Sequence, residues 1–312
     1  MAHTDGARGG GSRIPVGELR PGDHVALLHA SDEERAAVLR GFLLGGVAEE
    51  HKILYLVHAD GPDGPGELLA ECGLTGLPGA SEGQLQVLRP ADLAQPSGEL
   101  APAGRLASAG PRDPAALLGS LRAAAERARG EGYRALRVTG DLCTALCDGR
   151  DASRLLRYEA LLAEEFDHGG TLAVCQYDAR RCDTAALDAF ASVHPRSVEV
   201  DPLVRTAELV VVRTFDPPGL RIEGVVDTAS HRHLRDALQS VASVRGDVRL
   251  EMSGVEFLDL AGLRLLMTFA RARAARHCTV ELAGVPSHLL HVITLIGWDR
   301  TPGLRLGAAH AC

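Results

Sequence analysis

Residues 23–34 read Asp23-His-Val-Ala-Leu-Leu-His-Ala-Ser-Asp-Glu-Glu34, and this stretch decides the fold class of the first part of the chain. Residues 23–28 form a short apolar run that is typical of a buried strand. Ser31 and Glu34 form a capping box, in which the serine hydroxyl accepts from a backbone amide and Glu34 reaches back, so a helix begins there. A buried strand that leads directly into a helix favours an α/β fold.

Strand and helix signals alternate downstream of this stretch. We expect the helix after Ser31 to stop at Gly45-Gly46, because glycine is common at helix ends. Strands separated by helices of 10–15 residues form right-handed crossovers and therefore predict a RecA-like, mostly parallel sheet. The further predicted strands are 53–57, 85–88, 135–139 and 171–175.

The junction between the first strand and its helix argues against nucleotide hydrolysis. A P-loop protein would carry G-x-x-x-x-G-K-[ST] at this point. Residues 28–34 contain neither glycine nor lysine, and they carry three carboxylates where phosphates would lie. Like charges would repel a nucleotide, although a helix N-terminus can still bind a small polar ligand. No nucleophile, base and orienting group occur together, so we do not expect an enzyme.

The pattern changes near residue 205. Two apolar runs, 209–212 and 220–222, flank Asp216-Pro-Pro-Gly219, which predicts a hairpin. The elements expected after it are helix 230–242, strand 248–252, helix 260–276, strand 280–282 and helix 287–296. These elements predict a small, mixed α/β domain. The expected organisation is a disordered tail over 1–18, a first domain over 19–205 and a second domain over 206–312.

Composition limits the classes of function. A length of 312 residues fits two domains, and a formal charge of −8 argues against a nucleic-acid binder, which normally has a basic face. No run of about 18 apolar residues occurs, so we expect no membrane segment. Seven scattered cysteines suit a reducing cytoplasm. Cys143 and Cys147 lie four residues apart without a second ligand pair, so we expect no metal site and no cofactor.

Polar residues near the ends of predicted strands are candidates for a ligand site, since ligands of doubly wound sheets bind at the carboxyl ends of the strands. Tyr177 and Asp178 are the strongest pair, because an aromatic wall beside a carboxylate suits a small cation, amine or polar metabolite. The alternative role for Arg137 with Asp141 is an internal ion pair or a loop-bracing network. The alternative role for Tyr158-Glu159 is helix packing by the tyrosine and an exposed charge on the glutamate. The candidate ligand-binding residues are His29, Arg137, Asp141, Gln176, Tyr177 and Asp178.

Five short motifs suggest a family for the first domain. They are Pro21-Gly-Asp-His24, Arg137-Val-Thr-Gly-Asp141, Tyr158-Glu159, Cys175-Gln-Tyr-Asp178 and His194-Pro195. In this order they resemble the MEDS domain, a sensory module first named from methanogen and methylotroph regulators. The resemblance covers about residues 19–205 and implies a RecA-like core that has lost its P-loop. Thr144 and His29 stand where the family commonly has aromatic residues.

The second domain resembles a STAS domain, the fold of anti-sigma factor antagonists. The matching stretches are Gly224-Val-Val-Asp227, Val255-Glu-Phe-Leu-Asp-Leu-Ala-Gly-Leu263 and Gly297-Trp-Asp299, within about residues 208–312. The resemblance implies a partner, an anti-sigma factor or a related switch protein. It also implies a partner-binding surface formed by Asp227, Asp259, Leu260, Ala261, Gly262 and Leu263. STAS surfaces also pair with one another, which adds a homodimer to the expectations.

One departure from the STAS pattern bears on regulation. Antagonists of this family carry D-[ST]-S-G-L, and a partner kinase phosphorylates the second hydroxyl residue. Here the motif is Asp259-Leu-Ala-Gly-Leu263, so Ala261 occupies the acceptor position. Alanine cannot accept phosphate, so we expect control to pass to the first domain. The alternatives are a non-enzymatic scaffold of a stress-signalling complex and an enzyme that acts on a small metabolite in the RecA-like cleft.

Overall fold

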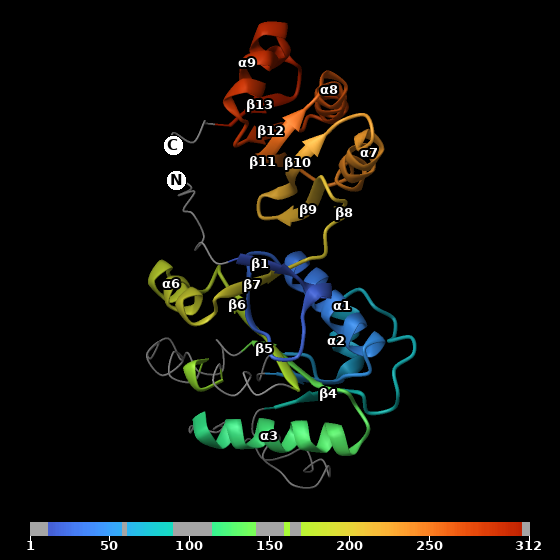
Figure 1. The fold of residues 1–312 in the computed structure, drawn as a ribbon, viewed down its shortest axis with the longest axis vertical. Coiled ribbons are helices and arrows are strands. Elements are labelled where there is room, and N and C mark those ends of the chain that lie inside the picture. The colour runs from blue at the N-terminus through green and yellow to red at the C-terminus, as the bar shows by residue number, and fades with distance from the viewer. Residues whose placement is uncertain (1–11, 58–60, 90–113, 142–158, 163–169, 308–312) are drawn as a thin grey trace. The chain divides into compact units, whose positions relative to one another are not determined.

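The computed structural model describes residues 12–57, 61–89, 114–141, 159–162 and 170–307. The chain divides into two compact units, residues 1–199 and 200–312. Each unit has its own sheet and its own helices (Figure 1). The two units are therefore described separately.

A seven-stranded sheet forms the centre of the first unit. Its strands are β1 (Ser12–Pro15), β2 (His24–His29), β3 (Lys52–Leu56), β4 (Leu85–Leu88), β5 (Leu136–Asp141), β6 (Thr171–Asp178) and β7 (Arg196–Glu199). Their order across the sheet is β1-β7-β2-β6-β5-β3-β4, and each neighbouring pair is parallel. The predicted α/β fold with a mostly parallel sheet is confirmed.

The first α-helix of the first unit begins at the predicted capping box, and further helices follow it along the chain. The helical elements are the 3-10 turn η1 (Val16–Glu18) and the α-helices α1 (Asp32–Ala48), α2 (Pro65–Glu71), α3 (Pro114–Gly130) and α6 (Thr184–Val193). The Ser31 hydroxyl accepts from the Glu34 amide at 3.1 Å, and the Glu34 carboxylate accepts from the Ala30 amide at 3.0 Å. The predicted capping box is confirmed.

Helix α1 continues through the glycine pair at which we expected it to stop. It ends at Ala48, so Gly45 and Gly46 lie inside its last turns. A Cβ atom on Gly46 would lie 2.6 Å from Cδ1 of Ile53 on β3, and one on Gly45 would lie 3.2 Å from the Arg137 guanidinium. The two glycines therefore serve close helix-to-sheet packing, which a sequence pattern cannot distinguish from a helix end.

The two faces of this sheet carry different side chains. Cys175 and Tyr177 belong to a hydrophobic cluster that includes residues of α3 and Phe190 of α6. Gln176, between them on β6, instead accepts a hydrogen bond from Arg35 of α1. Successive side chains of a strand point to opposite faces, so one face packs on α1 and the other on α3 and α6.

A mixed, six-stranded sheet forms the second unit. Its strands are β8 (Val204–Arg205), β9 (Leu209–Phe215), β10 (Pro218–Val226), β11 (Val248–Leu258), β12 (Val280–Ala283) and β13 (Leu304–Leu306), in the order β13-β12-β11-β10-β9-β8. Strands β9 and β10 form the predicted hairpin, and β10 to β13 are parallel. Strand β11 continues to Leu258, beyond the predicted end at Met252, because its pairing with β10 resumes after an irregularity in register.

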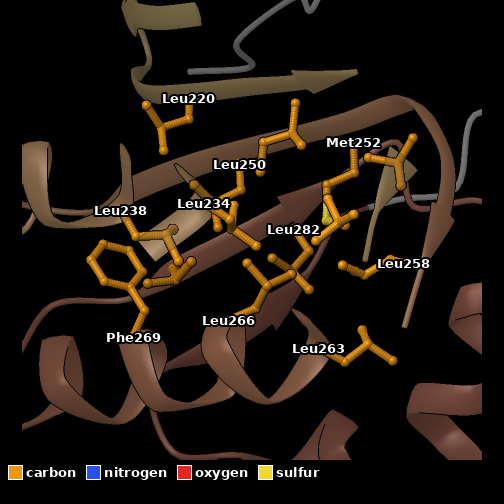
Figure 2. Close-up of a cluster of buried hydrophobic side chains, with 14 of the residues drawn as sticks. Leu220, Leu234, Leu238, Leu250, Met252, Leu258, Leu263, Leu266, Phe269 and Leu282 are labelled. Atoms are coloured by element: carbon orange, nitrogen blue, oxygen red, sulfur yellow. The ribbon is translucent and has the colours of Figure 1, made fainter. Parts of the chain in front are cut away.

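Helices cover the apolar face of the second sheet. They are α7 (His231–Ser240), α8 (Leu260–Ala274), α9 (Ser287–Ile296) and the 3-10 turn η3 (Trp298–Arg300). Figure 2 shows the core, in which Leu250 and Leu282 of the sheet meet Leu234, Leu263 and Leu266 of the helices. Burying each of these side chains stabilises the fold by about 1.5–3 kcal/mol. The core therefore fixes α8 on the sheet.

Across the described ranges, no helix combines the length and the apolar character that a membrane span requires.

Candidate functional site

The predicted ligand residues at the end of β6 do not share one pocket. Tyr177 is fully buried on the face that packs on α6, and its ring lies 4.2 Å from that of Phe190. Asp178 follows it and points to the opposite face, as strand alternation requires. The expected aromatic wall beside a carboxylate is therefore wrong, because adjacent residues of a strand cannot face the same cavity.

Arg137 lies at the wrong end of the sheet for a ligand at the carboxyl edge. It is the second residue of β5, in register with Ile53 and Leu172, the second residues of β3 and β6. These positions are near the amino ends of the strands. The prediction that Arg137 lines the carboxyl edge is therefore wrong.

The Arg137 side chain instead braces the interior. Its Nε donates to Nδ1 of His51 at 3.0 Å, and Nη1 donates to the Phe42 carbonyl at 3.1 Å. Nη2 donates to the Glu49 carboxylate at 2.9 Å. The guanidinium is 1% exposed, so these bonds compensate the loss of its hydration. This arrangement matches the bracing alternative.

Several residues singled out in the sequence lie outside the described part of the structure. Asp141 ends β5 and pairs with Gln176 through the backbone, but its side chain is outside that part. The other residues outside it are Cys143, Thr144, Cys147 and Tyr158.

His29 and Asp178 come together at the carboxyl edge, where they are register partners on β2 and β6. The Asp178 carboxylate accepts from Nε of Arg180 at 2.8 Å, and Arg180 also donates to Asp32 at the start of α1, at 2.7 Å. The Arg180 hydrogen bond lowers the pKa of Asp178, and the charge of nearby His29 lowers it further. The edge thus combines an ionised carboxylate, an imidazole and a helix N-terminus.

Gln176 is fully buried in a polar network between the sheet and α1. Its amide oxygen accepts from Nε of Arg35, and its amide nitrogen donates to the Thr139 hydroxyl, each at 2.9 Å. Arg35 also donates to the Tyr55 hydroxyl and to Glu71. Gln176 therefore orients Arg35 beneath the carboxyl edge and is not exposed to a ligand there.

A cavity of about 570 Å³ opens at the opposite side of the unit, beyond the end of α1. Its lining includes Glu50, Glu82, Glu131 and Tyr133. Glu50 directly precedes the segment that enters β3, so this cavity is near the amino ends of the strands. None of the predicted ligand residues lines it.

Four buried side chains from different parts of the first unit form a compact cluster on the α6 side of the sheet. They are His24 of β2, Glu159 of a short helical segment, Cys175 of β6 and His194 at the end of α6. Nε2 of His24 lies 3.1 Å from the Glu159 carboxylate and 3.2 Å from the Cys175 sulfur. Nε2 of His194 lies 3.2 Å from Nε2 of His24 and 3.5 Å from Glu159. We call these residues the His-Glu-Cys-His cluster.

The surroundings of this cluster hold Glu159 ionised. Burial alone would raise the pKa of Glu159, but hydrogen bonds from His194 and His24 lower it to about 2. The Tyr177 hydroxyl donates to the other carboxylate oxygen at 2.5 Å. Burial raises the pKa of the Cys175 thiol well above its usual value. The alternative that Glu159 is an exposed charge is wrong, since its side chain is 0% exposed.

Sequence spacing gave no sign of the cluster. His24 and His194 are separated by most of the first unit, and Glu159 and Cys175 have no ligand spacing of the kind found in metal motifs. Each residue does fall in one of the short motifs by which the first domain was likened to MEDS proteins. Those motifs meet in space only because β2 and β6 are neighbours in the sheet.

The start of α8 forms the second candidate site. Asp259 is the N-cap, and its carboxylate accepts from the Gly262 amide at 2.7 Å and from Nε2 of His231 at 2.8 Å. Partial burial alone would raise the pKa of Asp259, but the Gly262 amide and His231 lower it. Leu260 is 48% exposed, and Ala261 is exposed beside it. Residues 259–261 are therefore accessible from outside.

Two residues of the predicted partner surface are buried. Leu263 is 1% exposed and points into the core of the second unit (Figure 2). A Cβ atom on Gly262 would lie 2.5 Å from Cδ1 of Leu258 and 2.9 Å from Cγ1 of Val226, so a larger residue there would have to displace two buried side chains. The expectation that Gly262 and Leu263 contact a partner is wrong, because the helical period turns them toward the sheet.

Asp227 has a local structural role at the start of α7. Its carboxylate accepts from the Ala229 amide at 3.0 Å and from the Ser230 hydroxyl at 3.3 Å. Its side chain is half-buried. Sequence reasoning missed a third exposed apolar group near α8, since Phe257 on β11 is 50% exposed. The alternation of side chains between the two faces of β11 could have indicated that Phe257 is exposed.

Comparison with known proteins gives one family for each unit. The family described as MEDS, methanogen/methylotroph, DcmR sensory domain, matches residues 23–195. The family described as Mlab, STAS domain, matches residues 209–306. No curated protein matches the chain. A solved structure entitled "Structure of the Bacillus Cell Fate Determinant SpoIIAA in the Phosphorylated Form" has 15% identity and a TM-score of 0.24, over 29% of this chain and 83% of that chain.

Proposed function

We propose that this chain, which belongs to the MEDS sensory-domain family and carries a STAS domain behind it, is a signalling regulator of the anti-sigma factor antagonist kind. Its STAS domain binds an anti-sigma factor or a related switch protein. The observation that carries the proposal is the exposed start of α8, where Leu260 and Ala261 present an apolar surface on a rigid helix.

The chemistry of this surface suits docking to a protein. Leu260 and Phe257 are about half exposed, although most leucine and phenylalanine side chains of the unit are buried. Apolar side chains of this size contribute most of the binding energy when a partner covers them. Asp259 keeps the helix end in place through its bonds to Gly262 and His231. We call Phe257, Leu260 and Ala261 the α8 surface.

Regulation by phosphate on the α8 surface is excluded by the residues present. Neither Leu260 nor Ala261 carries a hydroxyl group. Two hydroxyl groups of the same two elements are those of Ser253, exposed on β11, and Thr268 of α8, which donates to the Arg264 carbonyl at 2.8 Å. In this proposal the signal instead enters through the MEDS unit, when a small polar ligand binds beside His29 and Asp178.

Partner binding is tested by affinity capture with the full chain, followed by titration calorimetry with the purified captured protein. We expect the wild type to retain an anti-sigma factor or a switch protein, and Leu260→Asp to weaken its affinity by about 30-fold or more, as loss of a central apolar contact does. Leu295→Asp is the control, because Leu295 is 77% exposed but lies on α9. Equal capture by both variants would contradict the proposal.

The regulatory part has separate tests. We expect a captured kinase to label Ala261→Ser with phosphate and to leave the wild type unlabelled. Labelling of wild-type Ser253 or Thr268 with loss of binding would contradict this. A thermal-shift screen of nucleotides and metabolites should find a ligand whose effect is lost in Asp178→Asn. A scaffold would respond to none of them, and an enzyme would consume one of them.

A further inference from the structure

We propose that His24, Glu159, Cys175 and His194 form a closed, four-coordinate zinc site inside the MEDS unit. The observation behind it is the His-Glu-Cys-His cluster, in which one ligand atom from each residue lies within 4.8 Å of all the others. All four side chains are buried. This inference does not depend on partner binding by the STAS domain, which lies in the other unit.

The distances between the ligand atoms fit a tetrahedral ion. Zinc binds histidine nitrogen at about 2.0–2.1 Å, carboxylate oxygen at about 2.0–2.2 Å and thiolate sulfur at about 2.3 Å. The edges of a tetrahedron with these bond lengths are about 3.3–3.7 Å long. Five of the six distances between these atoms are 3.1, 3.2, 3.2, 3.5 and 3.6 Å, and the sixth, between Nε2 of His194 and the Cys175 sulfur, is at most 4.8 Å. Five edges therefore already match the tetrahedron, and the sixth would need to shorten by at most about 1 Å around the ion.

The proton positions also suit coordination. Nδ1 of His194 lies 2.9 Å from the Phe190 carbonyl, which can only accept, so Nδ1 carries the proton. Nδ1 thus keeps its proton when zinc binds, and Nε2, which faces His24 and Glu159 and donates to Glu159 when no ion is bound, is the nitrogen that would coordinate the ion. A histidine ligand of zinc commonly has this outer hydrogen bond to a backbone carbonyl. The Tyr177 hydroxyl orients Glu159 in the same way, through a bond of 2.5 Å to its outer oxygen.

Charge balance favours a divalent cation. Two neutral imidazoles, one carboxylate and one thiolate together carry a charge of −2, so a dication leaves the buried cluster neutral. Without an ion, an ionised Glu159 in this fully buried position needs a protonated histidine beside it. A bound metal also converts the Cys175 thiol to a thiolate.

The ligand set points to zinc and to a holding role. Two imidazoles and one thiolate suit zinc, whereas magnesium and calcium prefer oxygen ligands. Four protein ligands leave no open position for water, as in structural zinc sites. The ion would tie the helical segment at residues 159–162 to β2, to β6 and to the end of α6. Zinc would therefore add to the packing of Leu162 in holding that segment on the sheet.

The test measures zinc in the full chain, purified without a polyhistidine tag, and then cobalt spectra of the metal-depleted protein. We expect inductively coupled plasma mass spectrometry to find about one zinc ion per chain. Cobalt should give the visible bands of a tetrahedral site and a thiolate charge-transfer band. Cys175→Ala should remove the charge-transfer band, and Cys182→Ala, a change of a half-exposed cysteine in the same unit, should keep it.

A milder variant keeps the test valid if ligand variants fail to fold. Tyr177→Phe removes only the hydroxyl that orients Glu159, and we expect it to lower zinc affinity by about 10–100-fold in competition with a chromogenic chelator. A folded wild-type chain that binds neither zinc nor cobalt would overturn the proposal in favour of a hydrogen-bonded cluster. The same charge-transfer band in Cys175→Ala and Cys182→Ala would also overturn it.

Discussion

Leu263→Ala and Leu260→Ala should separate stability from binding, although the two leucines lie on the same helix. Leu263 is 1% exposed and Leu260 is 48% exposed. Leucine-to-alanine removes three carbon atoms, which at about 0.8 kcal/mol each gives about 2.4 kcal/mol for the buried site. The cavity left behind raises this to about 3–5 kcal/mol. The exposed change should cost less than about 1 kcal/mol.

The assay is urea unfolding followed by tryptophan fluorescence. Trp298 is the single tryptophan of the chain and packs against the core of the second unit, so its signal reports that unit. With a urea dependence of about 1.5 kcal/mol/M, Leu263→Ala should lower the midpoint by about 2–3 M and Leu260→Ala by less than about 0.7 M. Leu260→Ala alone should weaken partner capture. Equal midpoints for the two variants would refute the assignment of Leu263 to the core.

Three further predictions concern single contacts. Arg137→Met should destabilise the first unit by about 3 kcal/mol, because it leaves a buried histidine ring and a buried carbonyl without a donor. The control Arg134→Met removes an ion pair between exposed partners and should cost less than about 0.5 kcal/mol. Unfolding followed by the near-ultraviolet circular dichroism of the tyrosines, all of which lie in that unit, measures both changes. Asp259→Ala should cost about 1 kcal/mol at neutral pH. Since folding lowers the pKa of Asp259, the difference in unfolding free energy between the wild type and Asp259→Ala should persist above about pH 4 and shrink as the pH falls through the lowered pKa. A difference in unfolding free energy that grows in acid would contradict this. Gly46→Ala should lower the melting temperature because its Cβ lacks space, whereas Gly119→Ala on α3 meets nothing within 4 Å and should raise it slightly; a rise in both would show that Gly46 is not a packing residue.

Local sequence signals determined much of this protein. The apolar run before Ser31 and the capping box fixed the first strand and helix, and the alternation that followed fixed a parallel α/β sheet. The turn at 216–219 fixed the hairpin of the second unit. The residues at single positions also showed that the strand–helix junction has no P-loop motif and that position 261 cannot accept phosphate, because alanine lacks a hydroxyl group in any fold.

Only the tertiary structure decided which side chains meet. Strand alternation sent Tyr177 and Asp178 to opposite faces, and the register of β5 put Arg137 at the amino edge, although all three had looked alike as residues near strand ends. The His-Glu-Cys-His cluster depends on the pairing of β2 with β6, a long-range contact that leaves no periodic trace in the sequence. Helices and turns arise from neighbours along the chain, whereas a site arises from neighbours in space, and for that reason the fold was predictable and the site was not.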